Sequence, residues 1–190
     1  MSVLVDRLAT LGMTTVGDLA QLDPFTAGYS NTLCGHLPTV IDQARASNGG
    51  GPFLARGLLR PKVRLADVEV DVDMENIDDG VYLWGTLVSG TAPALDQVGV
   101  EAGYRPFFSW DPVDAGVQLD VFDRFWAWLS DLRHRCRSLG LSFAAYCYTS
   151  AEHNKMVQIL DEAPRPVPGR REAIEDLVAS PDWVDMYQVV

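Results

Sequence analysis

The stretch from Asp67 to Glu75 reads DVEVDVDME and decides the fold class. Its acids alternate strictly with apolar residues, and β-branched residues at a period of two are typical of a strand with one apolar face. The other face then carries five carboxylates, spaced about 7 Å apart, which repel one another unless water or a cation compensates. This stretch therefore predicts either a strand with a solvated acidic face or a strand that binds divalent cations.

Two further strand-like runs follow this one. We expect the first strand over residues 63–75, the second over residues 81–89 after the turn Asp78-Asp79-Gly80, and the third over residues 104–110. The Asp-Asp-Gly turn between two β-rich runs predicts a hairpin. The three strands together predict an antiparallel meander.

Helical periodicity begins after the third strand. Apolar residues at spacings of three and four predict a long helix over residues 118–139, which Gly140 ends. An apolar run over residues 141–148 predicts a buried strand, and helices are expected over 151–160 and 171–179. The order predicts an α/β fold with a mixed sheet, three antiparallel strands followed by a helix and a parallel strand, flanked by helices on both faces.

The N-terminal region has a different pattern. Apolar residues between Val3 and Gly12 predict one helix, Thr15 is placed to cap a second over residues 16–22, and a third is expected over residues 39–45. The run from Ser47 to Pro52 is rich in glycine and predicts a linker. We therefore expect a small helical domain over residues 1–52 and an α/β domain over residues 53–190.

Composition narrows the class of protein. Apolar residues make up 47% of the 190 residues and charged residues 22%, which is typical of a globular chain. No apolar run approaches the roughly 20 residues of a membrane span, and the N-terminus lacks a secretory signal, so we expect a cytoplasmic protein without a membrane partner. Three widely spaced cysteines without a CxxC pair argue against disulfides and against a zinc site.

The net charge affects whether the protein can bind nucleic acid. Fifteen basic and 26 acidic residues give −11, which by itself disfavours nucleic acid. Seven of the acids fall between Asp67 and Asp79, however, and without them the count is −11 + 7 = −4. The excess of negative charge is therefore concentrated in one local feature.

Two motifs carry a resemblance to a known family. The stretches VDVDMEN (residues 70–76) and GVYLWGTLVSG (residues 80–90) resemble the YprB-type ribonuclease H-like domain of RecB-like putative nucleases, within the DEDD-exonuclease superfamily. In that family an Asp-x-Glu pair ends the first strand and a Tyr-Leu-x-Gly second strand follows. Residues 12–24, GMTTVGDLAQLDP, resemble the helix-hairpin-helix-like segment that precedes the domain.

The resemblance implies a site built from carboxylates. It implies that Asp73 and Glu75 hold two divalent cations, Mg²⁺ or Mn²⁺, and that Glu152 supplies a third carboxylate from the start of a helix. Asp185 is a weaker match to a further acid. Mg²⁺ prefers hard oxygen ligands, and two cations about 4 Å apart both activate a water and stabilise a leaving oxygen.

The function implied is hydrolysis of nucleic-acid phosphodiesters by a two-metal mechanism, as a 3′–5′ exonuclease on DNA. Arg133, Arg137 and Arg170 are then candidate phosphate contacts, although basic residues of this kind are more often solvated. An EF-hand loop over the same acids is disfavoured because Asn76 and Tyr82 stand where glycine and glutamate are required.

Two departures from the family leave an alternative open. The family's last acid lies in a helix beyond the position of Asp185, and the RecB-like nuclease and helicase segments that are common in these relatives are missing from the sequence. We therefore expect a C-terminally truncated piece of a longer protein, with those segments fused to it. The alternative is a non-catalytic module that keeps the fold and positions nucleic acid or a partner. The two hypotheses differ in whether Asp73→Asn and a chelator change the behaviour of the protein.

Overall fold

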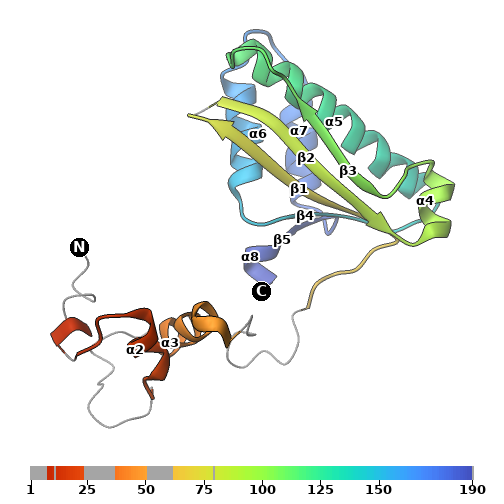
Figure 1. Cartoon of the computed structure of the whole chain (residues 1–190). Helices are drawn as coiled ribbons and strands as arrows, with labels where there is room; N and C mark the ends of the chain where they lie inside the picture. The colour runs from red at the N-terminus through yellow and green to blue at the C-terminus, as the bar shows by residue number, and fades with distance from the viewer. Residues whose placement is uncertain (1–7, 11, 24–36, 51–61, 79, 190) are drawn as a thin grey trace. The chain divides into compact units, whose positions relative to one another are not determined.

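The computed structural model describes residues 8–10, 12–23, 37–50, 62–78 and 80–189. These residues divide into two compact units, one within the first 61 residues and one from Lys62 to Val189 (Figure 1). The expected boundary at residue 52 falls in the segment 51–61, outside the described residues.

The N-terminal unit contains helices α2 (Val16–Gln21) and α3 (Leu37–Arg45). The predicted cap is confirmed, because the Thr15 side chain accepts a hydrogen bond from the Asp18 N–H and the Asp18 carboxylate accepts one from the Thr15 N–H. The expected linker instead begins with a distorted helical turn, Ala46–Gly50, in which Gly49 has a φ of 94°. Of the expected first helix, residues 8–10 are helical and the rest lies outside the described residues.

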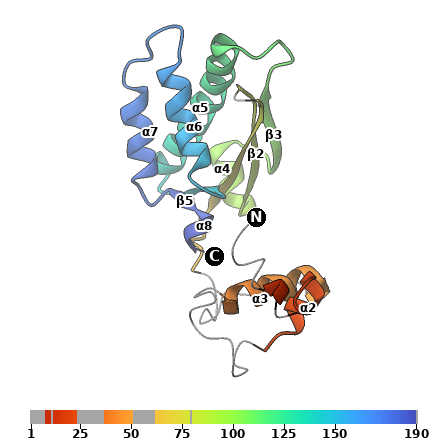
Figure 2. The same ribbon diagram turned by 90° about the vertical axis from the view of Figure 1, so that its left-hand side faces the viewer.

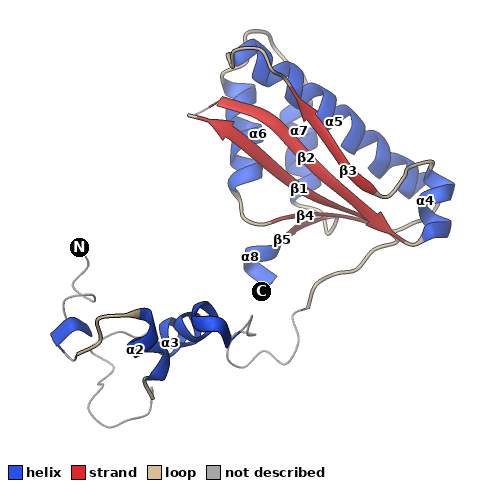
Figure 3. Ribbon diagram, viewed as in Figure 1, coloured by secondary structure: helices blue, strands red, loops and turns tan. Residues whose placement is uncertain are grey.

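The second unit is built on a five-stranded mixed sheet in the order β3-β2-β1-β4-β5 (Figure 3). β1 pairs antiparallel with β2, and β2 with β3, whereas β1 and β4, and β4 and β5, are parallel. The hairpin closes through the pair Ile77 and Gly80, as the turn predicts. The strands are β1 (Val68–Ile77), β2 (Gly80–Gly90), β3 (Gly103–Phe108), β4 (Phe143–Cys147) and β5 (Trp183–Asp185).

The helices α5, α6 and α7 lie together on one side of this sheet (Figure 2). The expectation of helices on both faces is wrong for the described residues, and the physical reason is the acidic face of β1, which offers no apolar surface for a helix to cover. We call this uncovered side the open face. The helices are α4 (Ala92–Val98), α5 (Ala115–Ser138), α6 (Ala151–Asp161), α7 (Arg170–Val178) and α8 (Met186–Val189).

The core lies between the sheet and these helices. The apolar face of β1 packs into it, with Val68, Val70 and Val72 at most 4% exposed and Met74 partly buried. Trp84 of β2 stacks on Phe125 of α5, with ring centroids 4.8 Å apart. Burial of each such side chain contributes about 1.5–3 kcal/mol, so the strict alternation of β1 fixes which face of the sheet is covered. None of the described helices is long and apolar enough to cross a membrane.

Candidate active site

The acids at the start of β1 are held by hydrogen bonds. The N–H and hydroxyl of Ser142 donate to Asp67 Oδ2 at 2.8 and 2.6 Å, which lowers the pKa of Asp67. Glu69 Oε1 accepts from the N–H of Ala66 and the hydroxyl of Tyr146, both at 3.0 Å. Asp67 and Glu69 therefore tie β1 to β4 and its flanking residues, and neither is placed to bind a cation.

The acids further along β1 have no such donors. Asp71, Asp73 and Glu75 make no hydrogen bond or ion pair with any residue that the structure describes, and all three are exposed. Asp71 pairs with Tyr146 in the last register position between β1 and β4, so Asp73 and Glu75 extend past the end of β4. Partial burial and the neighbouring charge of Glu69 raise the pKa of Asp71. This end of β1 presents carboxylates that nothing in the described fold neutralises.

Glu152 enters the same region from α6. It lies in the first turn of that helix, directly after β4, and is 5% exposed. Its Oε2 atom is buried and has no hydrogen-bond partner among the described residues. Burial raises the pKa of Glu152, and the charges of Asp73 and Asp185 raise it further. Glu152 is therefore within electrostatic reach of both of those acids.

Asp185 ends β5 beside Cys147 of β4. Its carboxylate accepts hydrogen bonds from the Tyr187 N–H and the Gln188 side chain, both at 3.0 Å. Cys147 is a buried core residue, as expected from its apolar run, and burial raises the pKa of its thiol to about 12. The carboxyl ends of β1, β4 and β5 thus bring together three of the four predicted metal ligands, Asp73, Glu152 and Asp185.

The carboxylates at this end of the sheet suit a divalent cation in their chemistry but not in their spacing. Glu75 lies two residues beyond Asp73 on the same face, about 7 Å further along the strand. Within the described residues, no group of three or more His, Cys, Asp or Glu side chains is close enough to hold a metal ion. The donors are nevertheless hard carboxylate oxygens, and a cation would supply the partner that the buried Glu152 oxygen lacks. These residues suit Mg²⁺ or Mn²⁺, whereas their present spacing does not close a site.

Two of the three predicted phosphate contacts have structural partners instead. Arg133 and Arg137 of α5 donate to Asp182 at 2.9 and 2.8 Å, and Arg64 does so at 3.2 Å. Asp182 is 7% exposed. Burial would raise its pKa, but the hydrogen bonds from Arg133, Arg64 and Arg137 prevail and lower it. Sequence reasoning missed Asp182, because its partners lie 45 to 118 residues away in the chain.

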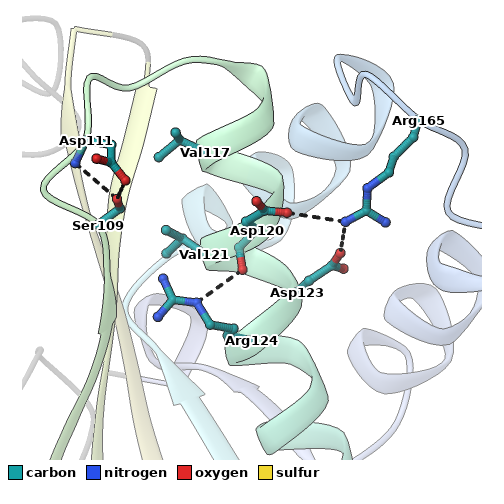
Figure 4. A pocket seen from close by; sticks show the side chains of 8 residues that line it. All are labelled: Ser109, Asp111, Val117, Asp120, Val121, Asp123, Arg124 and Arg165. Atoms are coloured by element: carbon teal, nitrogen blue, oxygen red, sulfur yellow. Dashed lines mark hydrogen bonds and ion pairs between the residues drawn. The ribbon is translucent and has the colours of Figure 1, made fainter.

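The third predicted contact, Arg170, pairs with Asp123 at 2.9 Å. Asp123 also accepts from Arg165 at 3.0 Å, at the rim of a surface cavity of about 470 Å³ on α5 (Figure 4). Arg165 reaches a second acid there, Asp120, at 3.3 Å. Of the acids of this cavity, Asp120 and Asp123 already have a cationic partner and Asp111 accepts a hydrogen bond from Ser109, and none of the predicted ligands lines it.

A second cavity, of about 440 Å³, adjoins Asp185. His153 lines it and is half-buried, with an Nε2 atom that has no hydrogen-bond partner in the described part of the chain. Sequence reasoning favours a polar surface role for this histidine. His153 instead lies near Asp185 on the wall of this cavity, which Ser150, Arg64 and Lys62 also line.

Comparison of the chain with protein-family models, with curated proteins and with solved structures finds no match. A functional assignment for this chain therefore depends on the residues and geometry described above.

Proposed function

We propose that residues 62–189 form a metal-dependent nuclease domain of ribonuclease H-like fold, which hydrolyses nucleic-acid phosphodiesters as a 3′–5′ exonuclease on DNA. Asp73, Glu75 and Glu152, with Asp185 at the rim, hold two divalent cations, Mg²⁺ or Mn²⁺. We also propose that the protein is cytoplasmic and that this domain is fused to RecB-like nuclease and helicase segments in a longer protein.

The arrangement of the sheet supports this proposal. β1, β4 and β5 run parallel, so their carboxyl ends meet at one edge, which is where open α/β sheets bind ligands. The acids at the opposite ends of these strands are occupied, by Ser142 for Asp67 and by three arginines for Asp182. At the carboxyl ends, by contrast, Asp73 and Glu75 have no partner among the described residues and Glu152 has a buried oxygen without one.

The observation that carries the proposal is Glu152. A buried carboxylate oxygen without a donor costs free energy, since burial penalises the charged form. Like charges at Asp73 and Asp185 add to this cost. A bound divalent cation removes both penalties.

The residues of the chain have distinct tasks in this reaction. The cations supply a water that is nucleophilic at neutral pH and stabilise the leaving oxygen. Asp73 and Glu75 hold their side of the site on a rigid strand, where neighbouring same-face positions are fixed by the pleat. Glu152 is fixed by burial of α6 against the core through Met156 and Ile159. The open face leaves the acids of β1 accessible to a polymeric substrate.

The test is hydrolysis of an end-labelled single-stranded oligonucleotide with Mn²⁺ or Mg²⁺. We expect the chain to shorten the labelled strand, a chelator to stop it, and Asp73→Asn to lower the rate by about a thousandfold, because metal stabilisation of charge contributes several kcal/mol. Glu101→Gln, an exposed acid before β3, is the matched control and should retain the rate. Persistent inactivity of the folded chain with either cation would contradict the proposal.

One observation favours the alternative of a non-catalytic module. The described carboxylates do not converge to metal-binding distance. A module of this kind binds nucleic acid or a partner with an affinity that neither chelator nor Asp73→Asn changes. Metal titration of the free protein separates the two functions, because only the nuclease gains thermal stability from Mn²⁺.

A further inference from the structure

Aromatic side chains follow β3 on the open face of the sheet. Tyr104 is 62% exposed and Trp110 is 87% exposed, which is unusual for rings of this size. Phe108 lies between them in the chain, and its ring contacts that of Trp110 at 5.2 Å in an edge-to-face arrangement. We call Tyr104, Phe108 and Trp110 the aromatic row.

Tyr104 reaches across β2 toward Asp73. Gly85 is the register partner of Asp73, and a Cβ atom built on Gly85 would lie 2.7 Å from the Tyr104 hydroxyl and 3.2 Å from its ring. The phenol therefore lies directly over Gly85, and a side chain at position 85 would displace it. This contact gives the glycine of the Tyr-Leu-x-Gly motif a physical reason.

Phe108 is in direct register with Glu75 across β2, whereas Tyr104 is in register with Asp71 and its ring leans along the sheet over Gly85. Glu75 pairs with Leu83 of β2, and Leu83 pairs with Phe108 of β3. Two strand separations amount to about 10 Å. Phe108 thus lies at about that distance from Glu75 across the same face, and the Tyr104 ring lies over Gly85, the neighbour of Asp73 on β2.

Resting on the proposed function, we infer that the aromatic row binds the unpaired bases of a single-stranded nucleic acid whose phosphates lie at the acids. A nucleotide places its base several ångströms to one side of its phosphate, and bases stack on exposed aromatic rings without strong sequence preference. The carboxylates alone would repel this ligand, so the cations are required for phosphate binding and the rings act on the bases.

The edge strand itself argues against a protein strand as occupant. β3 is at the edge of the sheet, and Pro106 in its centre has no N–H to donate to an added strand. A row of rings along β3 beside a row of acids along β1 suits a polymer whose bases lie to one side of its phosphates. A protein partner on the open face is the alternative occupant, and the test below can favour it over a nucleic acid.

The test compares an oligothymidylate with an abasic oligonucleotide of the same length, each fluorescein-labelled, on the full chain in Ca²⁺. Tyr104→Ala and Trp110→Ala should each weaken thymidylate binding by about fivefold to a hundredfold, the range measured for base stacking. Affinity for the abasic strand should change by less than about twofold. Tyr104→Phe keeps the ring and should retain binding, and Leu139→Ala, which removes an exposed apolar side chain beyond α5, is the matched control.

The outcomes separate this inference from the proposed function. Equal weakening of both ligands, no weakening of either, or no measurable binding of thymidylate would overturn the base-stacking role. Cleavage by wild type that Tyr104→Ala leaves unchanged would reject the aromatic row and keep the nuclease. Base-dependent binding without metal-dependent cleavage would reject the nuclease and keep the aromatic row. Thermal melting of each variant confirms folding, and a loss confined to the base-bearing ligand excludes a merely structural role.

Discussion

Asp182 and Glu152 are the two acidic side chains buried in the described part of the chain, at 7% and 5% exposure. Asp182, just before β5, accepts hydrogen bonds from three arginines, and these lower its pKa although burial opposes them. Glu152, in the first turn of α6, has a buried oxygen without a partner, and burial raises its pKa. Burial is similar at the two positions, whereas the local charge is opposite.

The difference teaches how this fold divides its charges. At the amino ends of the parallel strands, acids form a connected network that ties β1, α5 and β5 together. At the carboxyl ends, Glu152 has a buried oxygen without a donor and lies near the charges of Asp73 and Asp185. The free-energy cost of the second arrangement is offset only when something positive binds there, so the contrast supports the proposal of a cation site at the carboxyl ends.

The largest expected effect comes from removing the Glu152 charge. Glu152→Gln should lower metal-dependent hydrolysis by about a thousandfold and abolish the rise in melting temperature that Mn²⁺ produces. Without metal, the same variant should melt about 3 °C higher, because a buried carboxylate with one unpaired oxygen destabilises the fold by about 1 kcal/mol. Calorimetry with and without Mn²⁺ measures both changes.

Glu152→Gln is thus expected to lower metal-dependent hydrolysis and to raise the melting temperature of the metal-free protein, and these opposite signs make the result specific. Glu175→Gln on α7 removes an exposed carboxylate and should leave both quantities unchanged. If Glu152→Gln destabilised the metal-free protein, Glu152 would be a structural acid like Asp182, and the contrast between the two would disappear.

Asp182→Asn should act mainly on stability. It leaves Arg133 and its neighbours without their common acceptor, at a cost of about 3 kcal/mol in the free energy of unfolding at pH 7. Because the folded pKa of Asp182 is lowered below its ordinary value of 3.8, its contribution is full above that pH and is lost as the pH falls through the folded pKa. Urea unfolding at pH 7 and pH 3 should therefore show a smaller difference between variant and wild type at pH 3.

The metal response provides the control for Asp182→Asn. The arginine cluster stands at the opposite end of β5 from Asp185, so the variant should keep the stabilisation by Mn²⁺ under conditions where it is folded. Loss of that response in a folded variant would show that the two ends of the sheet are coupled.

Much of the fold follows from local patterns in the sequence. The alternation in β1, the Asp-Asp-Gly turn and the apolar periodicity of α5 predict these elements within a few residues. Helix α4 is absent from the predicted order, although Thr91 and Pro93 at its start and Gly99 at its end, where φ is 64°, are ordinary helix signals. β5 has three residues, too few for periodicity to reveal, and it exists because it pairs with β4.

The candidate site likewise has features that the sequence predicts and features that only tertiary contacts create. The strand pattern places Asp73 and Glu75 on one face of β1 together with the other acids, and only the family resemblance selects these two as ligands. The structural role of Glu69 could not be predicted from the pattern, because its donors include Tyr146, 77 residues away. The pairing of Arg133 and Arg137 with Asp182 is likewise a tertiary contact, which local charge patterns do not reveal. Long-range hydrogen bonds, rather than residue types, decide which acids and arginines are structural.

The smallest expected effects distinguish the arginines around Asp182. The Arg133 side chain is 15% exposed and that of Arg137 is 56% exposed, so solvent screens the second ion pair much more. Arg133→Ala should cost about 2 kcal/mol and Arg137→Ala less than about 1 kcal/mol in urea unfolding. Arg137→Ala thus tests the predicted phosphate contact with little change in stability. If Arg137 contacts phosphate, the variant should bind nucleic acid more weakly, and the slope of log affinity against log salt concentration should be smaller by about one. Unchanged binding would leave Arg137 only its role beside Asp182.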